Sequence, residues 1–282
     1  MKVADVMTPR EDLVTVELPG TREDALTYLQ EDAFSSVPVI KQTEDGEEFR
    51  GLVSREALIE QPDEDQLALL VEEVPPTTAD ATLDELAALM LAEGARRVPV
   101  VDGRLEGIVT VTDVVRAIAE GDVDGEVPVE DLATRAVNCV YVDTPLPVAG
   151  RELTHAGVPY GVVLDEEGEP CGMLTEVDII DVAEIVEGEE GAGESLADED
   201  DEWMWEGIKA VGNRYLPTRN VVLPAEPVRE FMTADLVTIS RRRTAQDAAQ
   251  LLLSHGVEQV PMVGGDDLVG IVVDIDLLEA LV

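Results

Sequence analysis

Two short glycine-led stretches of the sequence place an aspartate three residues after a threonine: Thr110 with Asp113, and Thr175 with Asp178. Each pair follows a glycine-led apolar run and opens an apolar helical segment, so we expect it at a strand-to-helix junction. There the carboxylate could accept both hydroxyls of a ribose, as an acidic residue does in dinucleotide folds. The threonine hydroxyl and the free N–H groups of the helix start favour phosphate. Thr-x-x-Asp is also a plain helix-capping box, and the pattern alone leaves both interpretations open.

Two further copies of this stretch are incomplete. The last copy keeps Asp276 but has Val273 in place of the threonine, so we expect it to hold a ribose with one phosphate contact fewer. The first copy has Ser54 but carries Ala57 in place of the carboxylate. The sequence therefore predicts two competent sites, one reduced site and one empty site.

Phosphate binding also needs positive charge, and the candidates are few. Arg96 and Arg97 stand directly before a Val-Pro-Val strand, and the equivalent positions of the other copies carry no arginine. Arg242 is the centre of three consecutive arginines between a predicted strand and helix. We expect these residues to contact phosphate, although arginines on an acidic surface could equally form simple ion pairs.

No catalytic or metal-binding constellation is present in the sequence. Two histidines, two cysteines and no phosphate-cradling glycine loop give no basis for an enzyme, a metal site or a bound cofactor. Cys139 and Cys171 lack the spacing of a zinc or disulfide framework, so we expect two small buried side chains. We expect His155 and His255 to be surface or core residues near helix ends.

The charge of the chain is extreme. Acidic residues number 62 against 19 basic ones, which gives a formal net charge of -43. This composition indicates adaptation to high intracellular salt, as in haloarchaea, because salt screens the self-repulsion. An acidic surface for a basic partner is the alternative. Nucleic acid is a poor partner for such a surface, and we expect none, since its binding relies on neutralising phosphates.

The remaining composition is that of a globular protein. Hydrophobic residues make up 45% of the chain and aromatic residues only 3%, so we expect an aliphatic core. No run approaches the length of a membrane span, and the first residues do not resemble a signal peptide. We therefore expect a cytoplasmic protein that does not bind membranes.

Internal repeats organise the chain. Helix-start signatures at Thr21, Thr82 and Thr144 are roughly sixty residues apart, and the one at Thr244 follows after roughly one hundred. Each copy shows the same order: a strand, an amphipathic helix, a strand of Val-Pro-Val type, the glycine-led strand and a final helix. In the third copy, Gly161 stands where the others have the proline. The sequence thus predicts four β-α-β-β-α units, with first strands near residues 13–16, 74–78, 139–142 and 236–239.

As a set, these features resemble the CBS domain, named after cystathionine β-synthase. The set comprises Met-Thr before the first strand (Met7-Thr8, Met232-Thr233), the Val-Pro-Val strand and Gly-h-h-Thr-x-x-Asp, with h apolar. The resemblance implies an α/β fold of four repeats in two pseudo-twofold Bateman modules that form a disc. Four such repeats in one chain resemble the γ subunit of AMP-activated protein kinase and its stand-alone archaeal relatives. The expected repeats span 1–62, 67–122, 127–187 and 226–282.

Residues 188–225 form an insertion between the last two repeats. Its first part is acidic and polar and is typical of a linker, whereas its second part carries Trp203 and Trp205. We expect an arm whose aromatic residues fill a groove; a lid over a ligand cavity or a docking site is the alternative.

The resemblance implies a regulatory protein that senses an adenine nucleotide such as AMP, ADP or ATP in clefts between paired repeats. It does not imply an enzyme. The nucleotide-binding residues that it implies are Thr110, Asp113, Thr175, Asp178, Asp276, Arg96, Arg97 and Arg242. Alternatives are another adenosyl ligand such as S-adenosylmethionine, or a ligand-free scaffold that docks a protein through its tryptophans. The regulated protein is not identified, and a homodimer remains open.

Overall fold

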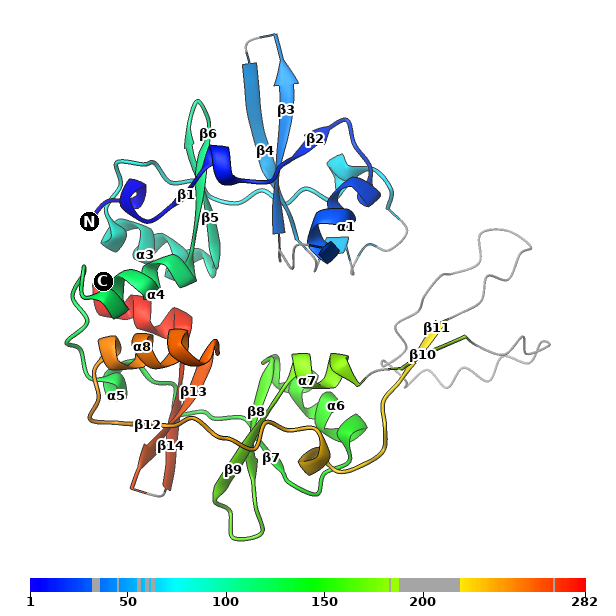
Figure 1. Ribbon diagram of the computed structural model, residues 1–282, viewed down its shortest axis with the longest axis vertical. Coiled ribbons are helices and arrows are strands. Elements are labelled where there is room, and N and C mark those ends of the chain that lie inside the picture. Colours follow the sequence, from blue (N-terminus) through cyan, green and yellow to red (C-terminus); the bar gives the residue numbers. More distant parts are fainter. Residues whose placement is uncertain are drawn as a thin grey trace. The chain divides into compact units, whose positions relative to one another are not determined.

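The structure is a computed structural model (Figure 1). It describes residues 1–31, 36–44, 46–54, 57–58, 61, 64–182, 184–187, 219–265 and 267–282. The chain divides into two compact units. The first comprises residues 1–134, 239–262 and 270–282, and the second comprises 135–238 and 263–269.

The first two repeats lie in the first unit, and each contributes one three-stranded sheet. The elements of repeat 1 are η1 (Val3–Asp5), β1 (Thr8–Pro9), η2 (Arg10–Asp12), β2 (Val16–Leu18), α1 (Arg22–Glu31), β3 (Ser36–Thr43) and β4 (Gly46–Ser54). Those of repeat 2 are η3 (Leu67–Leu69), α3 (Leu83–Glu93), β5 (Arg97–Asp102), β6 (Arg104–Thr110) and α4 (Val111–Glu120). The sheets have the strand orders β2-β3-β4 and β1-β6-β5, so β1 of repeat 1 completes the sheet of repeat 2.

Most of repeat 4 also belongs to the first unit. Its elements are η4 (Val228–Glu230), β12 (Ile239–Ser240), α8 (Ala245–His255), β13 (Gln259–Gly264), β14 (Asp267–Val273) and the 3-10 helix η5 (Asp274–Leu281). Helices α3 and α4 of repeat 2 pack against α8 and η5 of repeat 4 (Figure 1). The amide groups of Gln246 and Gln250 on α8 donate to the backbone oxygen of Ala119 on α4. Repeats 2 and 4 therefore share a helical interface.

Repeat 3 forms the body of the second unit. Its elements are α5 (Val129–Leu132), β7 (Cys139–Tyr141), α6 (Leu146–Ala156), β8 (Tyr160–Leu164), β9 (Pro170–Thr175) and α7 (Glu176–Asp181). Of these, α5 lies in the first unit. A separate antiparallel pair joins β10 (Glu184–Glu187) to β11 (Arg219–Val222), which is the described end of the predicted insertion. Trp203 and Trp205 lie outside the described residues, so the interpretations of the tryptophan arm stay predictions.

The helix boundaries follow local sequence signals. Thr82, Thr110 and Thr244 cap α3, α4 and α8 with reciprocal capping boxes. These three helices end at glycines with positive φ, which lack the Cβ that disfavours this conformation in other residues. The fold thus confirms the helix starts predicted at Thr82 and Thr244. In repeat 3, α6 begins at Leu146 and has Pro145 at its cap position, one residue after the predicted Thr144.

The predicted first strands agree less well with the structure. Strand β2 begins at Val16, after the 3-10 turn η2 that ends at Asp12, whereas the sequence predicts a strand from Leu13. The strand expected at 74–78 is reduced to a single parallel bridge between Thr77 and Val100. Strands β7 and β12 match the predicted regions only in part, and β12 begins later than expected.

One glycine in each repeat allows the leading segment of a neighbouring repeat to approach its sheet. A Cβ at Gly107 would lie 2.5 Å from the backbone oxygen of Thr8, and one at Gly172 would lie 3.0 Å from that of Thr233. Both distances are shorter than carbon–oxygen contacts normally allow. The Met-Thr segment packs directly on the glycine, and this close contact accounts for both motifs.

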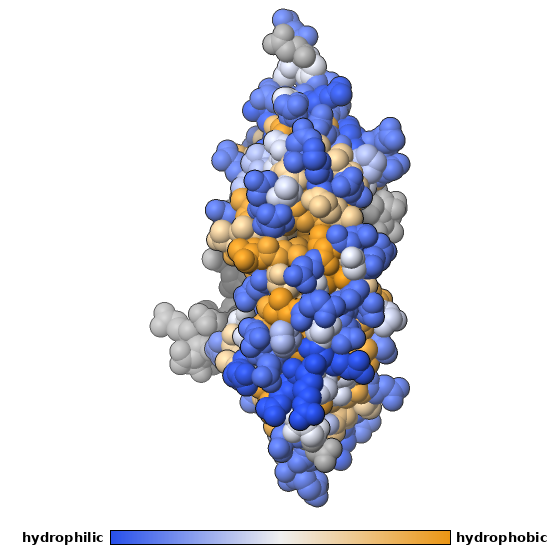
Figure 2. Space-filling view, turned by 90° about the vertical axis from the view of Figure 1, so that its left-hand side faces the viewer, coloured by the Kyte–Doolittle hydropathy of each residue, from blue (hydrophilic) through white to orange (hydrophobic). Residues whose placement is uncertain are grey.

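The core is aliphatic, as predicted. Among the described residues, Tyr160 is the one aromatic side chain in the buried hydrophobic set, which otherwise consists of Val, Leu, Ile, Ala and Met. The face shown in Figure 2 is largely polar, with its most extensive apolar area near the middle and smaller apolar areas below it. In the described part of the chain, no helix has the length and apolar character that crossing a membrane requires.

Candidate functional site

The first complete motif lies where β6 ends and α4 begins. The Thr110 N–H and Oγ1 donate to Asp113 Oδ2 at 2.9 and 2.7 Å, and the Asp113 N–H donates to Thr110 Oγ1 at 3.4 Å. The Asp113 side chain is 13% exposed. The motif is therefore a closed capping box in this structure, with its carboxylate and hydroxyl at the same helix start.

The second complete motif repeats this geometry between β9 and α7. The Thr175 N–H and Oγ1 donate to Asp178 Oδ2 at 2.8 and 2.7 Å, and the Asp178 N–H donates to Thr175 Oγ1 at 3.4 Å. In the incomplete first copy, the Ala57 N–H donates to Ser54 Oγ at 3.0 Å, so the hydroxyl still caps a helix. Capping thus accounts for the hydroxyl in the three repeats that carry one, and this geometry is compatible with ligand binding as well.

The motif carboxylates differ in the residue one helical turn further on. The Arg116 Nη1 donates to Asp113 Oδ1 at 3.0 Å. The equivalent residues are Asp181 after Asp178 and Glu279 after Asp276. A cation therefore supports the motif of repeat 2, and an acid stands near each of the other two.

Strand register places Arg97 beside the motif of repeat 2. Arg97 pairs with Thr110 across the antiparallel β5–β6 ladder, and side chains opposite each other on such a ladder have Cβ atoms about 5 Å apart. The equivalent pair in repeat 3 joins Tyr160 to Thr175. Tyr160 is buried. The structure therefore brings a cation to the first motif and an aromatic residue to the second.

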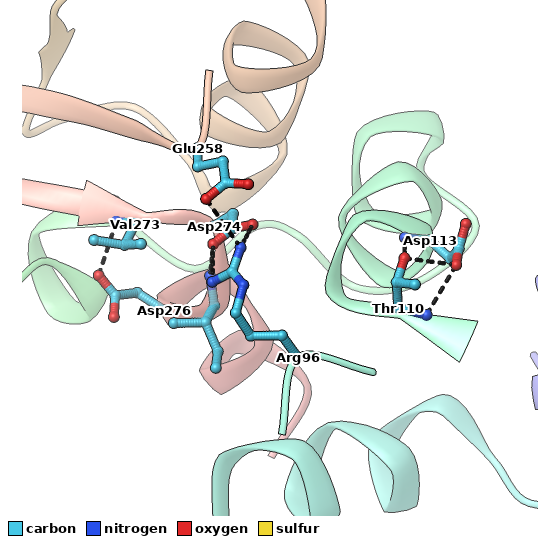
Figure 3. A network of polar contacts seen from close by, with 8 residues as sticks. Arg96, Thr110, Asp113, Glu258, Val273, Asp274 and Asp276 are labelled. Atoms are coloured by element: carbon cyan, nitrogen blue, oxygen red, sulfur yellow. Dashed lines mark hydrogen bonds and ion pairs between the residues drawn. The ribbon is translucent and has the colours of Figure 1, made fainter. Parts of the chain in front are cut away.

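Arg96, the residue before Arg97, contacts two carboxylates of repeat 4 (Figure 3). Its Nη1 and Nη2 donate to Asp274 Oδ1 and Oδ2 at 3.0 and 2.6 Å, and Nη2 lies 3.3 Å from a carboxylate oxygen of Glu258. Burial lowers the pKa of Arg96, but the hydrogen bond to Asp274 and the charges of Asp274 and Glu258 outweigh it, and that pKa is raised. The two arginines predicted to act together thus have different neighbours: Arg96 contacts repeat 4, and Arg97 lies beside the motif of repeat 2.

The reduced motif of repeat 4 lies at the same interface. The Val273 N–H donates to Asp276 Oδ2 at 2.9 Å, as in the complete motifs. Burial raises the pKa of Asp276 to about 6, against the hydrogen bond from Val273, and the charges of Glu279 and Asp274 contribute to the rise. This carboxylate is therefore less acidic than its position in the motif suggests.

The arginine cluster of repeat 4 lies on an exposed turn. Arg241 and Arg243 lie 3.7 and 3.6 Å from Glu130 and Asp247. In the described part of the chain, Arg242 is exposed and forms no ion pair, and it is not joined to the other predicted site residues. Arg241 and Arg243 thus form ion pairs, which is the alternative to phosphate binding that the sequence allows for this cluster.

The cysteines and histidines take no part in these sites. Cys139 is exposed and Cys171 half-buried, so the expectation of two buried cysteines was wrong for Cys139, which sits on an outward position of a short strand. His155 and His255 are exposed at the ends of α6 and α8. Within the described ranges, no group of three His, Cys, Asp or Glu residues could hold a metal ion.

Asp274 is the site residue that the sequence did not reveal. It lies inside the degenerate fourth motif, where an aspartate among 62 acidic residues gives no signal of its own. Its counter-ion is 178 positions away. Only the packing of α3 and α4 on η5 brings the two side chains together.

Comparison with known proteins agrees with the repeat structure. A family model described as the CBS domain matches residues 3–64, 68–120, 129–184 and 228–282. An uncharacterized conserved protein from Pyrococcus horikoshii has a similar crystal structure, with a TM-score of 0.71 and 28% identity over 100% of both chains. Protein MJ1225 from Methanocaldococcus jannaschii, described as a proposed archaeal homologue of g-AMPK, has a TM-score of 0.66 over 100% of both chains. At 17% identity, this second likeness shows the fold alone.

A curated relative is longer than this chain. The uncharacterized protein MJ1404 of Methanocaldococcus jannaschii is 26% identical over 279 residues, which cover 98% of this chain and 61% of the relative. The chain thus spans less than two thirds of the length of that relative.

Proposed function

Because the chain belongs to the CBS domain family, we propose that it is a regulatory protein that binds an adenine nucleotide at the motifs of repeats 2 and 3. The observation that carries the proposal is the cluster at the β6–α4 junction. There a carboxylate, a hydroxyl and a guanidinium come from Asp113, Thr110 and the cross-strand neighbour Arg97. The carboxylate suits the ribose hydroxyls of a nucleotide, and the hydroxyl and the guanidinium suit its phosphate.

Each group has a distinct role in binding. The Asp113 carboxylate accepts the ribose hydroxyls, for which it exchanges part of its capping hydrogen bonds. The Thr110 hydroxyl and the first N–H groups of α4 face phosphate, which the positive end of the helix dipole favours. Arg97 supplies the formal positive charge. Thr175 and Asp178 act in the same way in repeat 3.

Ligand binding at these junctions alters the caps of α4 and α7 and so biases the packing of the repeats. Such a ligand shifts the populations of two arrangements by its differential affinity for them. A partner protein that prefers one arrangement then reads the shift. The chain thereby acts as a sensor rather than as an enzyme.

A second ligand class fits repeat 3. Tyr160 occupies the cross-strand position of Arg97, so no arginine faces Thr175 from that strand. An adenosyl compound without phosphate, such as S-adenosylmethionine, would lose no binding contact through the replacement of arginine by tyrosine at this position. The alternative is therefore an adenosyl ligand without phosphate in this repeat.

Calorimetric titration distinguishes these ligands. We expect AMP and ATP to bind the chain in multimolar KCl more tightly than adenosine or S-adenosylmethionine. In Arg97→Gln, the affinity for AMP should fall about tenfold or more while that for adenosine is kept, because a charged hydrogen bond is lost. The matched control is Arg50→Gln, which removes an exposed arginine elsewhere in the first unit. Folded protein that binds none of the four compounds would contradict the proposal.

A further inference from the structure

The contact between Arg96 and Asp274 has the geometry of a phosphate-binding contact. Two guanidinium N–H groups meet two carboxylate oxygens in parallel, and arginine recognises phosphate with the same fork. The Asp274 side chain is 8% exposed and that of Arg96 is 36% exposed. The carboxylate therefore occupies the N–H edge of the guanidinium that a ligand phosphate would use (Figure 3).

Asp274 occupies a position where the fold does not require a charge. The Asp274 N–H donates to the Glu258 oxygen at 2.8 Å, just as the Val111 N–H donates to the Arg96 oxygen at 3.0 Å in repeat 2. Asp274 thus stands in repeat 4 where repeat 2 has a buried valine. Apolar residues can replace buried ion pairs without loss of stability, so fold stability alone does not account for this carboxylate.

We propose that Asp274 is a specificity-determining residue that occupies Arg96 as an internal anion and withholds this arginine from ligand phosphate. This inference rests on the proposed nucleotide binding. A phosphate that took Arg96 would leave the Asp274 carboxylate buried with only the Ile275 N–H, at 2.8 Å, as a described donor. That loss makes the exchange unfavourable. Arg97 therefore binds the phosphate, and Arg96, the cation beside the repeat 4 motif, does not.

The test compares variants of the full chain by calorimetric titration with AMP at the lowest KCl concentration that keeps them folded. Asp274→Asn should bind AMP at least about tenfold more tightly than the wild type, because Arg96 loses its competing charge. Its affinity for adenosine should not change. The double variant Arg96→Gln/Asp274→Asn should lose the whole gain. Glu258→Gln, which changes a carboxylate whose side chain is 70% exposed, should show a smaller gain with the fold intact.

Inorganic pyrophosphate is the second probe, because it separates this inference from the proposed function. Asp274→Asn should bind pyrophosphate more tightly than the wild type, and only when Arg96 is present, even if no adenosyl compound binds the chain. An equal pyrophosphate affinity of Asp274→Asn and wild type would overturn the inference. A gain that persists without Arg96 would also overturn it. Absence of adenosyl binding alone would instead contradict the proposed function.

Discussion

The guanidinium of Arg96 and the carboxylate of Asp274 form a two-point ion pair between repeats 2 and 4, although the residues lie 178 positions apart in the chain. Asp274 is the one buried charged residue among those that the structure describes. A carboxylate in such a place depends on its counter-ion, because burial without a partner is costly. The stability of the helical interface between repeats 2 and 4 therefore depends in part on this ion pair.

Removal of the arginine should destabilise the protein. Arg96→Gln leaves the Asp274 charge without its counter-ion, and we expect a loss of about 1–3 kcal/mol in the free energy of unfolding. Urea denaturation in multimolar KCl measures this loss. Arg50→Gln is the control, because it breaks an exposed pair with Glu48 and should cost less than about 1 kcal/mol.

The double variant Arg96→Gln/Asp274→Asn completes the thermodynamic cycle. It should be more stable than the sum of the two single changes predicts, since no buried charge is left unpaired. Additive losses would show that the two side chains are not coupled.

The pH dependence of stability should report on Asp276. Burial raises the pKa of this carboxyl from 3.8 to about 6, so the folded state binds its proton more tightly than the unfolded chain does. The stabilisation is fully present below pH 3.8 and is lost as the pH rises to about 6. Asp276→Asn removes the titration, while its amide oxygen can still accept the Val273 N–H.

Urea denaturation at several pH values measures this effect. The stability of the wild type minus that of Asp276→Asn should fall as the pH rises through this window, because the other carboxylates cancel in the difference. A difference that is independent of pH would contradict the raised pKa of Asp276.

The glycine at the start of β6's apolar run should resist substitution. In Gly107→Ala, the new Cβ would meet the Thr8 backbone oxygen at 2.5 Å, and we expect a loss of about 1–3 kcal/mol. Gly270→Ala is the matched control in repeat 4. There the nearest atoms are a flexible methionine end at 2.9 Å and a backbone oxygen at 3.0 Å, so the loss should be smaller. Thermal or urea unfolding that ranks the two variants in the opposite order would contradict this packing.

Much of the fold could be predicted from the sequence because its signals are local. The capping boxes at Thr82, Thr110 and Thr244 mark helix starts through hydrogen bonds within one turn. The glycine and Met-Thr motifs recur because every repeat receives a neighbour's segment at the same place. The family resemblance that these motifs carried is confirmed by four matches to the CBS domain model.

The candidate site was predictable only in part, because its charges are distributed by tertiary contacts. The sequence placed Arg96 and Arg97 together as phosphate ligands, yet one pairs with Asp274 and the other lies opposite Thr110. Adjacent positions at a strand start diverge in direction, and only packing decides what each one meets. The ribose and phosphate roles of the motif residues remain predictions, since a closed capping box is compatible with both interpretations.

The central claim is that Asp113 and Asp178 bind ribose in addition to capping helices. Its matched control is the double variant Asp24→Ala/Asp247→Ala. Asp24 and Asp247 accept the N–H groups of Thr21 and Thr244 in the same kind of capping contact, but outside the glycine-led motifs. Asp113→Ala/Asp178→Ala and the control should lose similar stability through their helix caps, on the order of 1 kcal/mol per cap.

Calorimetric titration of AMP into these two double variants and the wild type is therefore the most direct measurement. We predict saturable binding at about two sites in the wild type and in the control, as expected for one ribose carboxylate per complete motif. Binding should be lost in Asp113→Ala/Asp178→Ala. Unchanged AMP affinity in that variant, on protein shown to be folded, would contradict the account.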